Sequence, residues 1–569
     1  MQTLLQIKDL SIDFITENGV IPAIKDLSLS IDRGEILAIV GESGSGKSVT
    51  ALSILQLLPP TANYKSGEII FFENNGHTNL LSQSFKQIQQ VRGNKIAIIF
   101  QEPMTSLNPV FSCGEQVTET IVANKKISRA QAKELTIRLF EKVKLPHASD
   151  IYHRFPHQLS GGQKQRVMIA IALSCNPSLL ICDEPTTALD VTVQKSILEL
   201  IKEIQQAEKI GVIFITHDLG LVAEIADRAV VMLKGKIVEQ GNVNVIFNKP
   251  QHPYTKALMN CRPTMHKKGE RLPVVSDFTG VEIDYKELRS GDEQYKSKIP
   301  NQSVNQSGIP LIRVQDLSVW FPARKNFLGK ILTNTKAIDE ISFEVYKGET
   351  LGLVGESGCG KTTLGRTLLR LVQPTSGKIL FEGKDMAEFD SGELKRMRKN
   401  IQIVFQDPYS SLNPRLTIGS AIEEPLIVHK ILSSAKERRE KVEELLGDVD
   451  LKPEHFERYP HEFSGGQRQR IVIARALALN PSFIVCDESV SALDVSVQSQ
   501  ILNLLTDLKK QLGFTVIFIS HDLSVVHYLS DRIMVMHKGK IVETGTAEEI
   551  YFHPQKDYTK KLIAAIPTI

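Results

Sequence analysis

The chain has 569 residues, of which 42% are hydrophobic and 23% charged, and its formal net charge is only +3. This length allows several domains with large cores, and the balanced composition is typical of a globular protein. So small a net charge argues against nucleic-acid binding through bulk electrostatics. No apolar run approaches the roughly 20 residues of a membrane span, and the N-terminal residues lack a signal-peptide pattern. We therefore expect any membrane contact to be made through a separate partner chain.

The sequence repeats the same motifs in the same order. The glycine-rich stretch GESGSGKS at 41–48 returns as GESGCGKT at 355–362, and LSGGQ at 159–163 returns as FSGGQ at 463–467. The interval is 314 residues at the glycine-rich stretches, 305 at Phe100 and Phe405, and 304 from the SGGQ motifs onward. The nine additional residues in the first copy fall around FFENNGHTNLLSQSF, where we expect a surface loop. The constant order of the motifs, and their constant interval from the SGGQ motifs onward, indicate a tandem duplication.

Within each copy, short apolar runs alternate with helical patterns, which is typical of an α/β domain. In the first copy, EILAIV at 35–40 predicts a strand, and residues 48–58 have helical spacing. A helix-rich region follows over roughly 110–175. Apolar runs at 179–182 and 212–216 predict buried parallel strands. The run RAVVMLKGKIVEQG, matched by RIMVMHKGKIVETG, predicts a hairpin that turns at Lys-Gly.

These patterns predict a first domain at 1–262, a linker at 263–309 and a second domain at 310–569. Most of the linker's second half is the stretch RSGDEQYKSKIPNQSVNQSGI at 289–309, which is polar and poor in large apolar residues. Such composition favours a flexible tether, with a regulatory element as the alternative.

The glycine-rich stretch predicts a phosphate site in each domain. The pattern GxxxxGK[ST] wraps backbone N–H groups around a phosphate at a helix N-terminus, and its lysine adds a compensating charge. The hydroxyl group after the lysine is a ligand for Mg²⁺. The predicted residues are Gly41, Ser43, Gly44, Gly46, Lys47 and Ser48 in the first domain and Gly355, Ser357, Gly358, Gly360, Lys361 and Thr362 in the second.

Polar residues at later strand ends predict the catalytic groups. An acidic pair there would direct its aspartate toward Mg²⁺ and its water shell, and its glutamate would be the general base for hydrolysis. A glutamine after a strand would also touch Mg²⁺, and a histidine would hydrogen-bond the γ-phosphate. The alternatives are that the carboxylates only keep the strand ends soluble and that the glutamine and histidine have structural roles. These alternatives are weakened because the same residues recur at equivalent positions in both copies. The candidates are Gln101, Asp183, Glu184 and His217 in the first copy and Gln406, Asp487, Glu488 and His521 in the second.

Together these motifs resemble the nucleotide-binding domains of the ATP-binding cassette (ABC) family, over nearly the whole chain except the linker. The resemblance implies two tandem P-loop NTPase domains, each with a RecA-like core, an antiparallel β subdomain and a helical signature subdomain. The SGGQ motif matches the family's signature loop, which closes on the γ-phosphate held by the other domain. The signature residues are Ser160, Gly161, Gly162 and Gln163 and, in the second copy, Ser464, Gly465, Gly466 and Gln467.

The resemblance also implies how each nucleotide-binding site is completed and how the two sites are connected. Phe14 and Phe321 are in the place of the aromatic residue that stacks on adenine, with a buried core role as the alternative. Asp190 and Asp494 match the loop that connects the two sites. ATP and Mg²⁺ are then the cofactors, and the two domains form an intramolecular head-to-tail dimer.

A finer resemblance is to the ATPase subunits of peptide, nickel and glutathione importers. It is carried by QEPMTSLNP and QDPYSSLNP, by FPHQLSGGQ and YPHEFSGGQ, and by HPYTKALM and HPQKDYTKKLI. It implies ATP hydrolysis that drives uptake through two transmembrane permease subunits, served by an extracytoplasmic solute-binding protein. The chain would be peripheral on the cytoplasmic face of the inner (plasma) membrane, without nucleic acid. Peptide is the expected cargo, with glutathione or a nickel chelate as alternatives.

The chain departs from this subfamily in two places. Many relatives carry a cysteine-rich segment that can hold an iron–sulfur cluster after the HPYT motif, but only Cys261 lies near it here, so we expect no cluster. Ser489 and Val490 replace the Pro-Thr that follows the first acidic pair. Loss of the proline relaxes the local backbone but removes no catalytic group.

Two other classes of function remain open at this point. A soluble twin-cassette ABC ATPase could act on ribosomes or DNA, although the linker lacks a long charged helical arm and the chain lacks zinc-binding cysteine spacing. A non-catalytic scaffold is the other alternative, although no catalytic position is missing from either copy.

Overall fold

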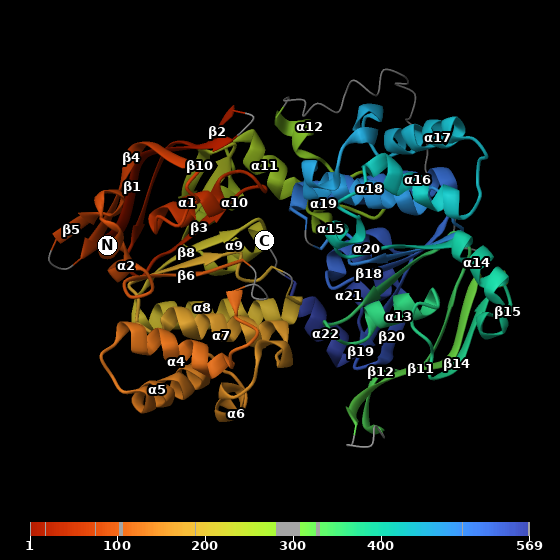
Figure 1. Ribbon diagram of the computed structural model, residues 1–569, viewed down its shortest axis with the longest axis horizontal. Coiled ribbons are helices and arrows are strands. Elements are labelled where there is room, and N and C mark those ends of the chain that lie inside the picture. Colours follow the sequence, from red (N-terminus) through yellow and green to blue (C-terminus); the bar gives the residue numbers. More distant parts are fainter. Residues whose placement is uncertain are drawn as a thin grey trace. The chain divides into compact units, whose positions relative to one another are not determined.

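The computed structural model describes residues 2–16, 19–73, 76–101, 106–187, 189–279, 308–325, 331–491 and 493–566. This part of the chain forms two compact units (Figure 1). The first unit covers residues 1–189 and 193–259, and the second covers 190–192 and 260–566. Residues 280–307 of the predicted linker lie outside the described residues, so the flexible tether remains a prediction.

The first unit is built on two sheets. A four-stranded antiparallel sheet has the order β2-β1-β4-β5, and a six-stranded sheet has the order β10-β9-β3-β8-β7-β6. The larger sheet is parallel except for the β9–β10 hairpin. The strands are β1 Thr3–Thr16, β2 Gly19–Asp32, β3 Ile36–Val40, β4 Ala62–Glu73, β5 Gly76–Asn79, β6 Ile96–Ile99, β7 Leu179–Asp183, β8 Gly211–Thr216, β9 Arg228–Leu233 and β10 Lys236–Asn242.

Helices cover the larger sheet and form a separate group after β6. The helices of that group, α4 to α7, gather on one side of the first unit (Figure 1). The helices are α1 Lys47–Ile54, α2 Phe85–Val91, α4 Cys113–Asn124, α5 Arg129–Lys142, α6 Ala148–Tyr152, α7 Gly161–Leu173, α8 Val191–Glu208, α9 Leu219–Ile225, α10 Val243–Asn248 and α11 Pro253–Asn260, with 3₁₀ turns η1 Leu80–Ser82 and η2 Pro156–Gln158.

The second unit repeats this architecture. Its sheets have the orders β12-β11-β14-β15 and β16-β17-β18-β13-β19-β20. The strands are β11 Ile312–Lys325, β12 Ile331–Val345, β13 Thr350–Val354, β14 Ser376–Phe381, β15 Lys384–Asp385, β16 Ile401–Val404, β17 Phe483–Asp487, β18 Thr515–Ser520, β19 Arg532–His537 and β20 Lys540–Thr546. The α-helices are α12 Val275–Thr279, α13 Lys361–Leu368, α14 Ser391–Asn400, α15 Pro408–Ser411, α16 Ile418–Val428, α17 Ala435–Asp448, α18 Gly465–Leu477, α19 Val495–Leu512, α20 Leu523–Leu529, α21 Ala547–Phe552 and α22 Asp557–Ala564. The described residues of this unit also form the 3₁₀ turns η3 Pro263–Met265, η5 Met386–Glu388, η6 Pro453–Glu457 and η7 Pro460–Glu462.

The buried strands confirm the predicted α/β class. Every residue of β3, β7 and β8 is buried, as expected for central parallel strands covered on both faces. The antiparallel sheet and the helical group supply the two predicted subdomains of each half. The helix expected at 48–58 ends earlier, at Ile54. It ends there because Gln56 has a φ of 49° and Leu57 N–H returns to the Leu52 carbonyl at 2.9 Å.

Most of the nine additional residues of the first copy extend the antiparallel sheet rather than form one surface loop. Ser66 pairs with Ser11, and Ser376 pairs with Ser318 in the second unit. The interval from Ser66 to Ser376 is 310 residues, so four of the nine residues lie before Ser66, where they lengthen β4. Four more lie in the stretch that forms the β4–β5 hairpin, because Asn79 and Asp385, which close the two hairpins, are 306 residues apart, and the last one lies between Ser84 and Ile96.

Residues 260–279, here called the docked segment, pack against the second unit. Leu272 is buried, and its N–H group donates to Asn503 Oδ1 at 3.0 Å. Asn503 Nδ2 donates to the Leu272 carbonyl at 2.8 Å. Ser499 Oγ donates to the Cys261 carbonyl at 2.5 Å, and Lys268 Nζ lies 2.7 Å from Asp531 Oδ1. The first part of the predicted linker therefore has a defined place in the fold.

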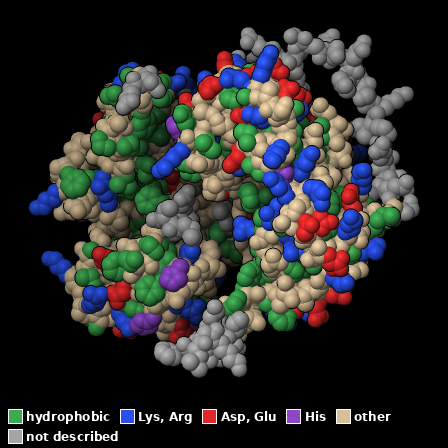
Figure 2. Space-filling view, turned by 45° about the vertical axis from the view of Figure 1, so that its right-hand side comes forward, with side chains coloured by type: hydrophobic (Ala, Val, Ile, Leu, Met, Phe, Trp, Pro, Cys, Tyr) green, Lys and Arg blue, Asp and Glu red, His purple; other side chains and the backbone are tan. Residues whose placement is uncertain are grey.

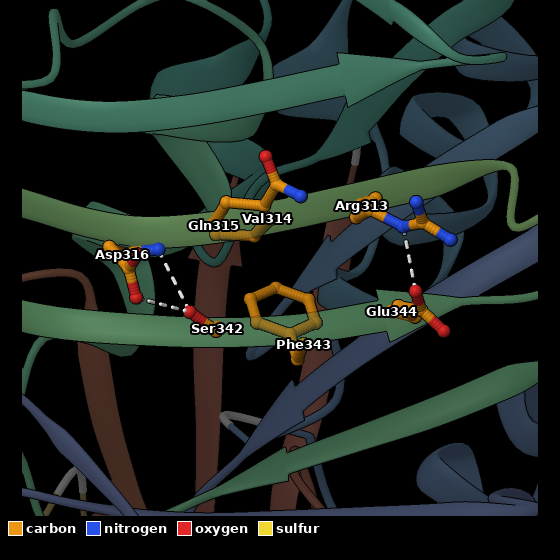
Figure 3. A pocket seen from close by; sticks show the side chains of 7 residues that line it. All are labelled: Arg313, Val314, Gln315, Asp316, Ser342, Phe343 and Glu344. Carbon is orange, nitrogen blue, oxygen red and sulfur yellow. Dashed lines mark hydrogen bonds and ion pairs between the residues drawn. The ribbon is translucent and has the colours of Figure 1, made fainter.

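An open hollow of about 700 Å³ lies on the second unit's antiparallel sheet. As Figure 3 shows, Asp316 N–H donates to Ser342 Oγ at 2.8 Å, and this hydroxyl donates back to Asp316 Oδ1 at 3.0 Å. Asp9 and Ser28 make the same two bonds in the first unit. Both aspartates have a left-handed φ, 46° and 47°, so the pair closes a β-bulge in each copy. The lining residues are Arg313, Val314, Gln315, Asp316, Ser342, Phe343 and Glu344.

The surface is mixed in charge. Basic and acidic side chains are interspersed on the face shown in Figure 2, in keeping with the small net charge. Within the described residues, no helix combines the length and apolar character needed to cross a bilayer.

Candidate active sites

The phosphate loops, residues 41–48 and 355–362, each join a central strand to a helix. The first lies between β3 and α1 and the second between β13 and α13. Gly46 and Gly360 precede the helices with φ values of 104° and 112°. A Cβ atom at Gly46 would lie 3.1 Å from the Ala23 carbonyl oxygen, and one at Gly360 would lie 2.2 Å from the Ala337 carbonyl oxygen. Glycine is therefore required at this position by both dihedral angle and space.

The loop lysines are buried and point back into their own loops. Lys47 Nζ donates to the carbonyl oxygens of Gly41 at 2.8 Å and Glu42 at 2.9 Å. In the second unit, Lys361 Nζ donates to the Gly355 and Glu356 carbonyls at 2.7 and 3.0 Å. Each ammonium group is held in the centre of its loop, where a bound phosphate would meet it.

A hydroxyl and a carboxylate meet beside each loop. Ser48 Oγ donates to Asp183 Oδ1 at 3.0 Å, and Thr362 Oγ1 donates to Asp487 Oδ1 at 3.0 Å. Burial raises the pKa of Asp183 to about 6, against the opposing hydrogen bond from Ser48, and burial also raises the pKa of Asp487. Hydroxyl and carboxylate oxygens are the hard donors that suit Mg²⁺.

In the first unit, Glu184 contacts the predicted residues Gln101 and His217. Gln101 Nε2 donates to Glu184 Oε2 at 3.0 Å, and His217 Nδ1 lies 3.4 Å from Glu184 Oε1. Thr187 Oγ1 also donates to Glu184 Oε2 at 3.0 Å. Glu184 itself has a φ of 48°, a left-handed value that L-residues rarely adopt. Such local strain is found at functional sites held in place by their surroundings.

The second unit repeats this arrangement around Glu488. Gln406 Nε2 donates to Glu488 Oε2 at 2.8 Å, His521 Nδ1 lies 3.5 Å from the same oxygen, and the φ of Glu488 is 47°. Lys361 Nζ lies 3.8 Å from Glu488 Oε1, which connects the carboxylate to the phosphate loop.

The electrostatic environment keeps both glutamates ionised. Burial favours the neutral acid, but the hydrogen bonds and charge of His217 and of His521 outweigh it and hold the pKa values of Glu184 and Glu488 below the ordinary range. Burial alone would lower the pKa of His521, yet Glu488 prevails and raises it. An ionised carboxylate can accept a proton from water.

The signature motifs stand at helix N-termini. Ser160 caps α7 by accepting from Gln163 N–H at 3.3 Å, and Ser464 caps α18 in the same way with Gln467. A Cβ atom at Gly162 would lie 2.5 Å from Val193 Cγ1 of α8, so glycine lets the two helices approach closely. The prediction that each signature completes the other domain's site concerns the relative placement of the units and stays a prediction.

The aromatic candidates lie outside the buried cores. Phe14 is half-buried on β1, opposite Ile21 of β2. Phe321 is exposed on β11, opposite Thr335 of β12. Their stacking on adenine stays a prediction.

Sequence reasoning missed several contacts. Thr187 was not singled out, although it follows the acidic pair directly. No role was given to Tyr254 and Tyr558, although both belong to the quoted C-terminal motifs. Their hydroxyls accept from the N–H groups of Glu42 and Glu356 in the phosphate loops, at 3.0 and 3.1 Å.

The chain matches two protein-family models and is similar to several import ATP-binding proteins. Residues 24–187 and 338–491 match the ABC transporter model, and residues 238–280 and 542–569 match the oligopeptide/dipeptide transporter, C-terminal region. The chain is 49% identical to a glutathione import ATP-binding protein of Shigella boydii serotype 4 (strain Sb227) and 48% identical to that of Escherichia coli (strain K12). It is 49% identical to that of Salmonella choleraesuis (strain SC-B67). Each alignment covers 99% of this chain and 89% of the relative.

Proposed function

The chain belongs to the ABC transporter family, and we propose that it hydrolyses Mg·ATP at two sites to drive import of short peptides, glutathione among them, through a separate permease. The chemistry rests on one observation above all. In each unit, a glutamate with a left-handed φ is held by a glutamine and a histidine, and these contacts recur with nearly equal distances. Each phosphate loop also carries a buried lysine.

Binding of the triphosphate would start from the phosphate loop. The N–H groups of the loop and the N-terminus of α1 provide a positive field for the β- and γ-phosphates. Lys47 would turn its ammonium group from the Gly41 and Glu42 carbonyls to the phosphate oxygens. Its burial means that little solvent competes for this charge.

Hydrolysis would use Glu184 as the general base. Its carboxylate would accept a proton as water attacks the γ-phosphorus, and Gln101 and His217 keep it in place. His217 would also donate a hydrogen bond to the γ-phosphate. A positioned general base contributes typically about 10²- to 10⁴-fold in rate.

Ser48 and Asp183 fit the binding of Mg²⁺. The hydroxyl oxygen of Ser48 and the carboxylate oxygen of Asp183 are 3.0 Å apart. The Gln101 side chain, which follows the neighbouring strand β6, would add an amide oxygen. The ion would neutralise charge on the β- and γ-phosphate oxygens. Thr362, Asp487 and Gln406 would do the same in the second unit.

We further propose that the sites are shared between the two domains in a head-to-tail dimer. Ser160 and the N–H groups at the start of α7 would stabilise the γ-phosphate held by Lys361, and Ser464 would serve the site of Lys47. Preorganised donors of this kind act on charge that develops in the transition state.

The proposed partners are two permease subunits and an extracytoplasmic solute-binding protein, with this chain peripheral on the cytoplasmic face of the inner membrane. Support comes from the match to the oligopeptide/dipeptide transporter C-terminal region and from the similarity to glutathione import ATP-binding proteins. Val110 and Phe111 are exposed beside the first glutamine loop and Tyr409 beside the second. These apolar side chains suit contact with permease helices. We propose residues 102–109 and 407–414 as the segments that receive permease helices, and the structure describes the first of them from residue 106 onward.

Uptake by cells lacking the gene tests this function. The wild-type chain should restore uptake of labelled glutathione or labelled trialanine, and a variant carrying both Glu184→Gln and Glu488→Gln should restore neither while reaching the membrane fraction in equal amount. Crosslinks from residues 106–109 and 407–414 should land on the permease. Restored uptake with the double variant would refute hydrolysis-driven import, and crosslinks confined to ribosomal proteins would favour the soluble twin-cassette alternative.

A further inference from the structure

One tyrosine of each C-terminal motif contacts a phosphate loop. Tyr254 Oη accepts from the N–H group of Glu42 at 3.0 Å, and Tyr558 Oη accepts from the N–H group of Glu356 at 3.1 Å. Both tyrosines lie in the first turn of a helix, α11 or α22, within the residues that match the oligopeptide/dipeptide transporter C-terminal region. The contact joins residues 212 positions apart in the first unit and 202 apart in the second.

The tyrosine and the lysine hold opposite ends of one peptide group. The peptide between Gly41 and Glu42 offers its carbonyl to Lys47 Nζ at 2.8 Å and its N–H to Tyr254 at 3.0 Å. The peptide between Gly355 and Glu356 is held in the same way by Lys361 and Tyr558. If the lysine turned to a bound phosphate, it would release this carbonyl, and the tyrosine would still hold the N–H group of the same peptide.

A carboxylate anchors each tyrosine-bearing helix to the core. Glu239 of β10 accepts from the N–H groups of Gln251 at 2.8 Å and His252 at 3.1 Å, just before α11 begins. Although burial opposes ionisation, these hydrogen bonds hold the pKa of Glu239 below its usual range.

The second unit has the same anchor. Glu543 of β20 accepts from the N–H groups of Gln555 at 2.7 Å and Lys556 at 3.2 Å, ahead of α22. Each tyrosine is therefore carried by a helix whose start is fixed to the large sheet.

Packing restricts where the hydroxyl groups can point. The Tyr254 side chain is fully buried, and the Tyr558 ring stacks on His537 with centroids 4.0 Å apart. The hairpin that leads to each helix also contacts its loop: Gly235 N–H donates to the Ser45 carbonyl at 3.0 Å, and Gly539 N–H donates to the Cys359 carbonyl at 2.9 Å. The C-terminal part of each domain thus holds the phosphate loop at two points.

We propose that Tyr254 and Tyr558 are positioning residues for nucleotide binding, which hold the first peptide group of each phosphate loop in the orientation that the phosphates require. The proposal rests on the proposed function in that the ligand of the loop is ATP. It assigns to the C-terminal region of this subfamily a role at the nucleotide, through the loop backbone rather than through contact with substrate.

Tyrosine-to-phenylalanine variants of the full chain test this role, because they keep the ring and remove only the hydroxyl. With both Tyr254→Phe and Tyr558→Phe, the KM for ATP should rise about 3- to 10-fold, as expected for one neutral hydrogen bond per site, while kcat stays within about twofold. The matched control is Tyr152→Phe. This tyrosine is also buried, and its hydroxyl bonds to Thr118 Oγ1 at 3.1 Å in the helical group.

Hydrogen exchange supplies a readout that a general loss of stability would not reproduce. In nucleotide-free protein, the peptide covering 41–47 should exchange faster in the Tyr254→Phe variant and unchanged in the Tyr152→Phe control, with Tm within about one degree of wild type. Glu239→Gln weakens the anchor from outside the loop and should shift both the exchange and the KM in the same direction.

Unchanged loop exchange and unchanged KM would overturn the positioning role. So would an equal rise in KM for the Tyr152→Phe control, because the loss would then follow general destabilisation. If the wild-type chain bound no ATP, the proposed function would fail, while the exchange of the loop would still decide whether the tyrosine positions it.

Discussion

The docked segment offers a prediction whose size can be worked from the structure. Asn503 lies on α19 and is 4% exposed, and its amide satisfies both backbone groups of Leu272, at 3.0 and 2.8 Å. Asn503→Leu would leave one N–H and one C=O group of Leu272 unpaired in a buried place. Each unpaired group costs about 1–3 kcal/mol, so the docked segment should lose roughly 2–6 kcal/mol of its attachment.

The two ion pairs of this segment are weaker, whereas Ser499 Oγ holds the buried Cys261 carbonyl and Tyr528 Oη holds the Glu270 carbonyl, each at 2.5 Å. The ion pair of Arg271 with Asp507 is half-exposed, and that of Lys268 with Asp531 is partly exposed, so each contributes little, about 0–1 kcal/mol. The apolar anchor is Leu272 itself, which is 1% exposed. We therefore expect local release of the residues around Leu272 in the Asn503→Leu variant, rather than release of the part held at Cys261 or unfolding of the second unit.

Hydrogen exchange of peptides within 260–279 measures this release. A loss of about 2 kcal/mol corresponds to roughly 30-fold faster exchange through local opening. The matched control is Glu199→Leu, at the equivalent position of α8 in the first unit, where the side chain is exposed; it should leave the docked segment unchanged. Exchange of residues 260–279 that stayed within twofold of wild type in Asn503→Leu would refute the assignment of the anchor.

Three further predictions concern the ATP sites. Glu488→Gln should slow turnover at its own site by at least about 10²-fold, measured as phosphate release with the permease bound, because the general base is lost; wild-type turnover in a variant lacking both glutamates would contradict this role. Thr362→Ala should raise the Mg²⁺ concentration needed for half-maximal activity, whereas Thr362→Ser should not, because it keeps the hydroxyl ligand. Lys47→Ala combined with Ser464→Arg should have the ATP turnover of its worse single variant, since both changes damage one shared site. Lys47→Ala combined with Ser160→Arg damages both sites and should have a lower ATP turnover than either single variant. Equal activity of these two double variants would count against the head-to-tail arrangement.

Much of the candidate site was predictable because its residues are marked by local patterns. The strand before the phosphate loop, the helix after it and the carboxyl ends of β7 and β8 are all encoded by short apolar runs next to polar residues. Carboxyl ends of parallel strands meet at one edge of a sheet, so Gln101, Glu184 and His217 could be expected to meet. The left-handed φ of Glu184 could not be read in this way, because the strain is imposed by tertiary contacts.

Contacts between distant segments were harder to predict. Nothing in the local pattern of HPYT shows that the hydroxyl of Tyr254 reaches a loop residue 212 positions away. The docked segment was interpreted as part of a polar tether, because one buried leucine among charged residues has no periodicity. The available signal was Asn503, a polar residue among the apolar residues of α19, at a position where the first copy has the exposed Glu199. A buried amide needs hydrogen-bond partners, and here a separate segment supplies them.

Because the chain is duplicated, each contact of the proposed site can be compared between two copies. Around the tyrosine the two copies differ, since His252 and Pro253 of the first are replaced by Lys556 and Asp557 in the second. The helix start therefore changes in both charge and backbone freedom, yet the carboxylate anchor and the bond to the loop N–H persist. Because the contact survives this change of neighbours, it depends on the tyrosine hydroxyl and its anchor rather than on the flanking residues. The same comparison distinguishes the docked segment from the contacts that both units share. The amide that binds this segment, Asn503 of α19, is replaced by Glu199 at the equivalent position of α8.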